Sequence, residues 1–117
     1  MIYVGIESSN LNVLKGINRF TVDNDQQYQI INELKKNGII VKSMFMLANP
    51  DDSVETIKDT IKYAKFLPNQ LVQFSVFTPY PGTPAYSEFK DKIIVQDFEK
   101  YNQYNLVYKH KSLGNDV

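Results

Sequence analysis

Three short apolar segments, separated by segments with helical periodicity, constrain the fold of this 117-residue chain most strongly. Residues 2–6, 39–47 and 71–77 are rich in β-branched and aromatic side chains, and the continuous apolar run at residues 2–6 has the pattern of a strand buried on both faces. Between them, apolar residues recur at every third or fourth position, as in amphipathic helices. Strands joined by helices run parallel and are connected by right-handed crossovers. The sequence therefore predicts an α/β fold with about three parallel strands and crossover helices.

Capping residues predict where the longer helices begin and end. Asp23, with Gln26 three residues later, forms a capping box for one helix, and Gly38 follows its last turn. Asp52 and Glu55 are expected to open the next helix, because acidic side chains favour helix amino-termini. Beyond residue 85 the periodicity weakens, and residues 112–116 are expected to form a frayed tail.

Composition excludes several classes of protein. A hydrophobic content of 43% suffices for one domain with a core, and no apolar run approaches the roughly 18 residues of a membrane-spanning helix. Thirteen basic residues balance thirteen acidic ones, and basic residues do not cluster, so neither a nucleic-acid partner nor a membrane is expected. The amino-terminus lacks the features of a signal peptide, so a cytoplasmic location is the expectation. Cysteine is absent, which excludes disulfides, thiolate metal sites and a cysteine nucleophile within the chain.

Polar loops follow each of the three predicted strands. The loop at residues 78–84 holds three prolines, which fix φ and remove backbone donors, and Gly82, which permits a conformation that other residues resist. Residues 7–9 and 49–52 follow the other two strands and supply carboxylates, hydroxyls and an amide. The carboxyl ends of parallel strands converge, so these loops form a candidate site suited to hydroxyls, an amine and a purine edge.

Four motifs, in order along nearly the whole chain, resemble the second half of a radical SAM barrel. They lie at residues 4–9 (Val-Gly-Ile-Glu-Ser-Ser), 13–19, 45–50 and 73–83. The sequence is most similar to the subgroup that often carries an upstream cobalamin-binding domain and resembles the anaerobic magnesium-protoporphyrin ester cyclases. The resemblance implies that residues 1–90 are the carboxyl-terminal half of a partial TIM-type barrel. Residues 91–117 would then be an aromatic-rich extension.

The resemblance also assigns polar binding residues. Glu7 matches the position that accepts hydrogen bonds from the ribose hydroxyls of S-adenosylmethionine, with Ser8 beside it. Arg19 resembles an arginine that pairs with the methionyl carboxylate in some relatives, for which a planar two-pronged donor is suited. A solvated cation at a helix end is the alternative for Arg19.

The same comparison places five further residues around the adenine. Met46 and Leu47 match residues that flank the base, although ordinary core packing explains them equally well. Phe77, Thr78 and Pro79 match a segment that contacts the base through backbone groups and an apolar face. No residue of the chain is assigned a catalytic or metal-binding role.

Two departures from the pattern bear on the function. Members usually read Gly-Leu-Pro-Gly-Glu-Thr where residues 48–53 read Ala-Asn-Pro-Asp-Asp-Ser, which argues against close backbone approach to a ligand at this loop. The 4Fe-4S cluster of the family is held by three cysteines, which the resemblance places upstream of this chain.

The chain is therefore expected to be a piece of a radical SAM oxidoreductase or methyltransferase. Its expected cofactors are S-adenosylmethionine and the upstream cluster, with cobalamin a candidate in the full-length protein. Its expected partners are the rest of its own barrel, an upstream domain and a small-molecule substrate. Alone, the chain is expected to bind S-adenosylmethionine weakly, to be inactive, and to expose sheet edges through which a homodimer could form.

Other readings stay open. A stand-alone α/β binding or interaction module that self-associates through open sheet edges is the main alternative, and a phosphate-binding barrel lacks the glycine-rich cradle it would need. In the extension, Tyr101, Tyr104 and Tyr108 are expected to pack against the outside or the lower end of the barrel. His110, the single histidine, has no catalytic pattern near it and is left unassigned.

Overall fold

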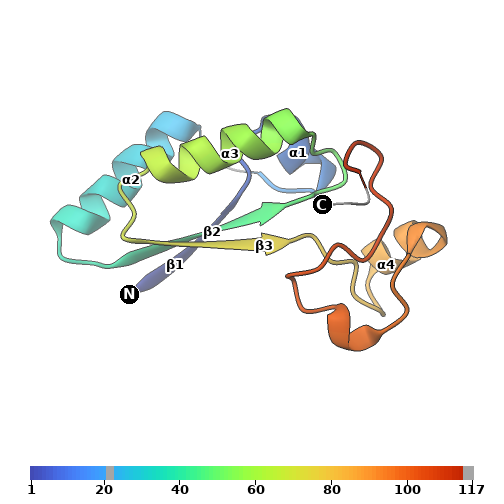
Figure 1. The fold of residues 1–117 in the computed structure, drawn as a ribbon. Coiled ribbons are helices and arrows are strands. Elements are labelled where there is room, and N and C mark those ends of the chain that lie inside the picture. Colours follow the sequence, from blue (N-terminus) through green and yellow to red (C-terminus); the bar gives the residue numbers. More distant parts are fainter. Residues whose placement is uncertain (21–22, 115–117) are drawn as a thin grey trace.

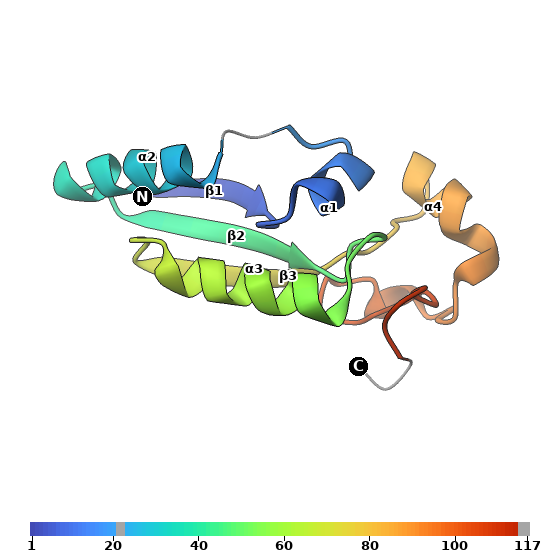
Figure 2. The ribbon, with the colours of Figure 1, turned by 90° about the horizontal axis from the view of Figure 1, so that it is seen from above.

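The computed structural model describes residues 1–20 and 23–114 and has an α/β architecture (Figures 1 and 2). In chain order its elements are β1 (Ile2–Glu7), α1 (Leu11–Gly16), α2 (Asn24–Lys36), β2 (Val41–Leu47), α3 (Val54–Phe66), β3 (Leu71–Val76) and α4 (Pro84–Phe89), followed by 3-10 turns at Lys90–Lys92 and Phe98–Lys100. The three predicted strands and the helices between them are therefore confirmed.

The sheet has the strand order β1-β2-β3, and both pairs of neighbours are parallel. The pairing of β1 with β2 shifts register between Gly5 and Glu7, at the carboxyl end of β1. The described residues thus form an open three-stranded parallel sheet. This sheet alone does not establish that the chain is a fragment of a barrel.

The helices cover one face of the sheet. Figures 1 and 2 show α2 and α3 side by side over this face, and no helix of the described residues covers the opposite face. Within β2, Val41, Ser43 and Phe45 are buried while the residues between them are half-exposed. The expectation that residues 2–6 form a strand buried on both faces is therefore wrong, because only Ile6 of β1 is buried and a continuous apolar run does not reveal how many layers cover it.

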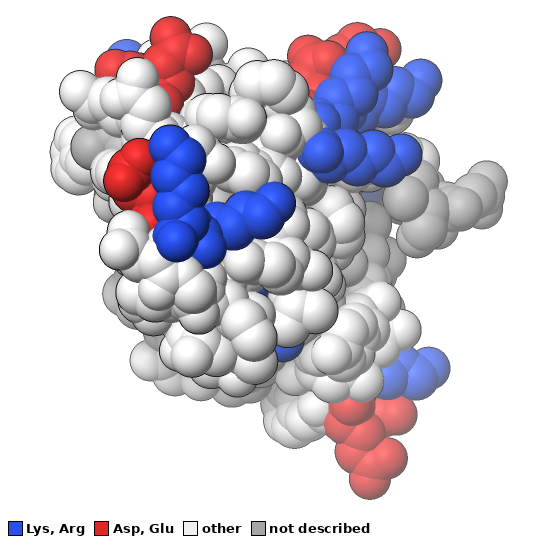
Figure 3. All heavy atoms as spheres, turned by 90° about the vertical axis from the view of Figure 1, so that its left-hand side faces the viewer, with Lys and Arg blue, Asp and Glu red and all other residues white. Residues whose placement is uncertain are grey.

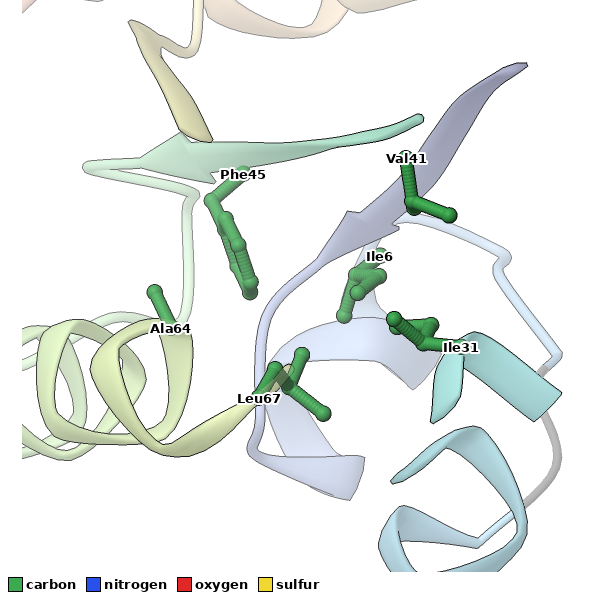
Figure 4. Packing of buried hydrophobic residues seen from close by; sticks show 6 residues of the cluster. All are labelled: Ile6, Ile31, Val41, Phe45, Ala64 and Leu67. Carbon is green, nitrogen blue, oxygen red and sulfur yellow. The ribbon is translucent and has the colours of Figure 1, made fainter. Parts of the chain in front are cut away.

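The core lies between the sheet and the two long helices. Its buried residues converge from both strands and helices, as Figure 4 shows: Ile6, Ile31, Val41, Phe45, Ala64 and Leu67. Phe45 is 1% exposed and its ring packs at 5.6 Å from that of Phe74 on β3. The central strand therefore supplies the largest side chain of this cluster.

Local hydrogen bonds account for the helix starts. The Asp23 carboxylate accepts from the backbone N–H of Gln26, so the predicted start of α2 is confirmed. For α3 the expectation is confirmed for Glu55, which lies in the first turn, but the N-cap is Ser53, and its reciprocal partner is Thr56. Asp52 instead accepts a hydrogen bond from the Thr56 hydroxyl, so a threonine performs the capping role that the acidic pattern assigns to carboxylates.

The extension folds back over the carboxyl end of the sheet. Val76 donates its N–H to the carbonyl of Gln103, and Tyr108 pairs with Ile93 in an antiparallel bridge. Packing against the outside or lower end of a barrel is therefore wrong for Tyr108, which lies where β2 ends. Leu113 is buried, so the expected frayed tail is wrong at residues 112–113, and residues 115–116 lie outside the described part.

Charged side chains of both signs are interspersed on the face of the molecule that Figure 3 shows, where lysines and arginines lie beside acidic residues. None of the helices in the described residues has the length and apolar character needed to cross a membrane.

We expect Phe45→Ala to lower the free energy of unfolding by about 3–5 kcal/mol, because it leaves a cavity at the centre of the core. Phe20→Ala is the matched control, because the Phe20 side chain is 94% exposed and should contribute little. Urea denaturation of both variants measures the difference. Equal losses would contradict the described core.

Candidate functional site

The three loops predicted to form a site do meet at one edge of the sheet. The parallel register sets Glu7 beside Phe45 and Leu47 beside Val76, and the N–H of Phe77 donates to the carbonyl of Leu47 at 2.8 Å. Residues 7–9, 48–52 and 77–84 therefore all begin at the carboxyl edge, where parallel α/β folds bind their ligands.

Glu7 and Arg19 lie together at the end of β1. The Arg19 Nη2 atom is 3.8 Å from Glu7 Oε1 and donates to the carbonyl of Gly5 at 3.0 Å. A Cβ atom on Gly5 would lie 2.9 Å from Glu7 Oε1, so a side chain at this position would push the carboxylate away from its place over the strand. Arg19 is thus half-exposed, hydrogen-bonded to the backbone of β1 and close to the Glu7 carboxylate, while its role toward a ligand stays a prediction.

Both groups lie on the face of the sheet opposite the core. Val4 and Ile6 pack toward the helices, so the Gly5 position between them faces the other way. The Glu7 carboxylate and the Arg19 guanidinium contact that position and therefore lie on the uncovered face. This arrangement offers a double acceptor beside a forked donor, a pair suited to hydroxyl groups and a carboxylate.

Glu7 has an unusual backbone and an unusual ionisation. Its φ is 68°, in the left-handed region that side chains disfavour, and strained residues of this kind concentrate at binding and active sites. Burial raises the pKa of Glu7 above its ordinary value of 4.5, and the neighbouring Arg19 opposes this shift.

Ser8 has an internal role in the described structure. Its side chain is 2% exposed, its hydroxyl accepts from the N–H of Asn10, and it lies 3.3 Å from the hydroxyl of Thr60 on α3. The N–H of Ser9 also donates to Thr60. Thr60 therefore anchors the loop after β1, a contact across 52 residues of sequence that no local pattern could have revealed. A role for Ser8 toward a cofactor stays a prediction.

Met46 and Leu47 are both half-buried but belong to opposite faces of the sheet. Phe45 points into the core, so strand alternation places Met46 on the uncovered face and Leu47 on the helix face. Met46 therefore shares a face with Glu7 and Arg19, and Leu47 does not.

Phe77, Thr78 and Pro79 are held by internal contacts. The Phe77 ring packs edge-on against Phe89 and Tyr108, the Thr78 hydroxyl donates to the carbonyl of Val76, and Pro79 is fully buried. Their side chains thus fix the shape of the loop, and the N–H of Phe77 is also used within the fold.

The loop between β2 and α3 is unusually well bonded. Ala48 has a φ of 57°, so it takes the left-handed conformation at the position where the resembled family has glycine. Asn49 is fully buried: its N–H donates to Asp52, and its side-chain amide donates to the carbonyl of Met46 and to Asp52. These polar side-chain atoms bond within the loop and to the end of β2.

Asp51, in the same loop, makes two contacts with other elements. It pairs with Lys111 of the extension, and a Cβ atom at Gly16 would collide with its carboxylate. The end of α1 and the β2–α3 loop are therefore interlocked at this point. Within the described residues no cluster of three or more His, Cys, Asp or Glu side chains is arranged to hold a metal ion.

Comparison with known proteins finds enzymes of the class that the sequence motifs indicate, namely methyltransferases and ester cyclases. No family model matches the chain. It is 31% identical, over 92% of its length, to bacteriochlorophyllide d C-8(2)-methyltransferase of Chlorobaculum tepidum, and 29% identical, over 97%, to the C-12(1)-methyltransferase of the same organism. It is also 33% identical, over 67% of its length, to the anaerobic magnesium-protoporphyrin IX monomethyl ester cyclase of Rubrivivax gelatinosus.

These matches cover only part of each relative. The chain spans 25% of the two methyltransferases and 14% of the cyclase. The relatives are methyltransferases and cyclases, and the ester cyclases are the proteins that the sequence motifs resemble. The chain is thus similar to a segment of enzymes of the expected kind.

We expect Ala48→Gly to raise the free energy of unfolding by about 0.5–1 kcal/mol. Glycine removes the strain of an alanine in the left-handed conformation, and this gain exceeds the cost of a more flexible unfolded chain. The same change at Ala64, buried within helix α3, should destabilise by about 1 kcal/mol or more. Thermal and urea unfolding of the two variants should therefore shift in opposite directions. A loss of stability in Ala48→Gly would contradict the described backbone.

The raised pKa of Glu7 gives a second expectation. A carboxyl whose pKa is higher in the folded state favours folding at low pH, and this contribution is lost as the pH rises from about 4.5 through the folded value. Glu7→Gln cannot ionise, so it should be more stable than the wild type near neutral pH and should lose this advantage in acid. Urea denaturation from about pH 3.5 to 7 measures the difference. If the stability advantage of Glu7→Gln over the wild type instead grew toward acid, folding would favour the ionised form of Glu7, and the expectation would be wrong.

Proposed function

We propose that this chain is part of a radical SAM enzyme of the methyltransferase or cyclase type, and that its strand ends contribute part of the S-adenosylmethionine pocket. The observation that carries the proposal is the pairing of the Glu7 carboxylate with the Arg19 guanidinium on the uncovered face of the sheet. The similarity to methyltransferases and to ester cyclases over most of the chain supports it.

Each group has a matching partner on the nucleotide. Glu7 would accept hydrogen bonds from the two ribose hydroxyls, and Arg19 would donate to the methionyl carboxylate. Met46 would lie against the adenine from the same face, with Leu47 forming the strand end beside it. The backbone of residues 77–79 would meet the edge of the base. Hydrogen bonds from the ribose would also stabilise the ionised form of Glu7, which burial disfavours.

The chain's own residues do not fit the iron-sulfur cluster of such enzymes. Thiolates hold these clusters, and the sequence contains no cysteine. The role proposed for the chain is therefore confined to binding and orienting the nucleotide. Cluster chemistry, and cobalamin where the enzyme uses it, would depend on residues outside this sequence.

The remainder of the barrel is the proposed partner of the uncovered face. The chain spans a quarter or less of the relatives' length, which leaves ample sequence in such enzymes to complete the sheet. Gly5 and Ser75 are small, and Gln73 is polar, at positions whose register and alternation place them on this face. A face of this kind suits the lining of a polar interior, where a small-molecule substrate would also bind.

Titration of the isotopically labelled chain with S-adenosylmethionine, followed by amide chemical shifts, tests the proposal. We expect weak binding, with the largest shifts near Glu7, Arg19 and Met46. Glu7→Gln should weaken binding about tenfold, since it removes a charged acceptor. Glu33→Gln is the matched control, because it removes the same charge from the exposed surface of α2.

Two results would overturn the proposal. One is a titration without localised shifts at the strand ends, and the other is equal weakening by the two glutamate variants. Concentration-dependent self-association without any response to S-adenosylmethionine would favour the stand-alone interaction module.

A further inference from the structure

We propose that Tyr108 and His110 are positioning residues, which fix the β2–α3 loop and thereby the end of β2 that carries Met46. This inference rests on the proposed function, because it concerns the same nucleotide pocket. It gives the aromatic extension a role in binding, although neither side chain belongs to the set assigned to the nucleotide.

The two side chains bind consecutive carbonyl groups of the loop. The Tyr108 hydroxyl donates to the carbonyl of Ala48 at 2.7 Å, and His110 Nε2 lies 2.7 Å from the carbonyl of Asn49. Tyr108 is 1% exposed and His110 is 4% exposed. Hydrogen bonds shielded from water in this way are costly to break, because buried polar groups lose a partner. The Asn49 carbonyl also accepts from the N–H of Asp52 at 2.9 Å, so the loss of the His110 ring removes one of its two bonds.

The surroundings of His110 determine its tautomer. A carbonyl oxygen can only accept, so the proton must be on Nε2. Nδ1 then accepts from the N–H groups of Ser112 and Leu113, at 3.0 and 3.2 Å. All polar atoms of the ring are therefore used by the neutral form, and the ring links the end of the extension to the loop.

The spacing of the two donors matches the shape of the loop. Side chains two residues apart on an extended segment point the same way, so Tyr108 and His110 can bind adjacent carbonyls from one side. Those carbonyls belong to the left-handed Ala48 and to the fully buried Asn49. A strained conformation persists only where its surroundings impose it, and these two bonds supply that restraint.

The loop transmits this restraint to the site. The Asn49 side-chain amide donates to the carbonyl of Met46 at 2.7 Å, so the backbone of the strand end is bonded directly to the clamped loop. Tyr108 also packs against Phe77, whose N–H donates to Leu47. We call the two hydrogen bonds from Tyr108 and His110 to the loop the clamp. Its loss should displace backbone groups at the ends of β2 and β3.

Tyr108→Phe is the decisive variant, because it keeps the aromatic packing and removes only the hydroxyl. Tyr101→Phe is the matched control: the Tyr101 hydroxyl donates to the carbonyl of Val95 at the same distance of 2.7 Å, within the extension but away from the loop. We expect Tyr108→Phe to raise the dissociation constant for S-adenosylmethionine about fivefold to tenfold. Tyr101→Phe should leave it within about twofold, although both variants lose some stability.

Variants of His110 test the same inference independently, and one of them keeps the hydrogen-bond donor. His110→Ala should weaken binding as much as Tyr108→Phe does. His110→Gln, whose amide can still donate to the Asn49 carbonyl, should recover most of the affinity. The amide signals of Ala48 and Asn49 should move in the weakened variants and stay near their wild-type positions in Tyr101→Phe.

The possible outcomes separate this inference from the proposed function. If the wild type does not bind S-adenosylmethionine, the proposed function fails. Amide exchange across residues 48–52 then decides whether the clamp exists, since it should accelerate in Tyr108→Phe and not in Tyr101→Phe. If the wild type binds and the two tyrosine variants behave alike, the positioning role is overturned while the proposed function stands.

Discussion

Parallel pairing of β2 with a neighbour on each side is the interaction on which the rest of the molecule depends. Because β1 and β3 both align with β2, all three strands end at the same edge, and each connection must cross back over the sheet. The crossovers place α2 and α3 on one face of the sheet. Phe45 of the central strand is buried there, in one cluster with residues from the sheet and from the helices. The candidate site follows from this geometry, since the shared edge brings the three loops together.

The two faces of the sheet have different chemistry. The helix face buries Val41 and Phe45, whereas the opposite face carries the carboxylate of Glu7 and the guanidinium of Arg19. This segregation keeps the charged pair out of the core, because residues on the uncovered face contribute little to it. Two of the non-glycine residues with positive φ lie at the carboxyl edge of the sheet: Glu7, the last residue of β1, and Ala48, which directly follows β2. The Arg19 guanidinium lies beside Glu7, and the Tyr108 hydroxyl donates to the carbonyl of Ala48.

Sequence patterns predict the elements well because their causes are local. The Asp23 cap and the apolar periods act within a few residues of the chain, so the sequence alone suffices to locate α2 and the three strands. The failures involve contacts between distant segments. Thr60 anchors the first loop from 52 residues away, and Tyr108 reaches a carbonyl 60 residues before it. No periodicity encodes such contacts, so sequence patterns place the extension at the wrong end and give no sign of the internal role of His110.

The interlocking of Gly16 with Asp51 has an evolutionary consequence. A larger side chain at the end of α1 could be accommodated only if the acidic side chain facing it became shorter or turned away. These two positions should therefore vary together among homologous proteins, with bulk at one matched by its absence at the other. A further constraint comes from Lys111, whose ammonium group would lose its counter-charge in any such exchange. Substitutions at Gly16, Asp51 and Lys111 are therefore expected to depend on one another, although the three residues lie far apart in the chain.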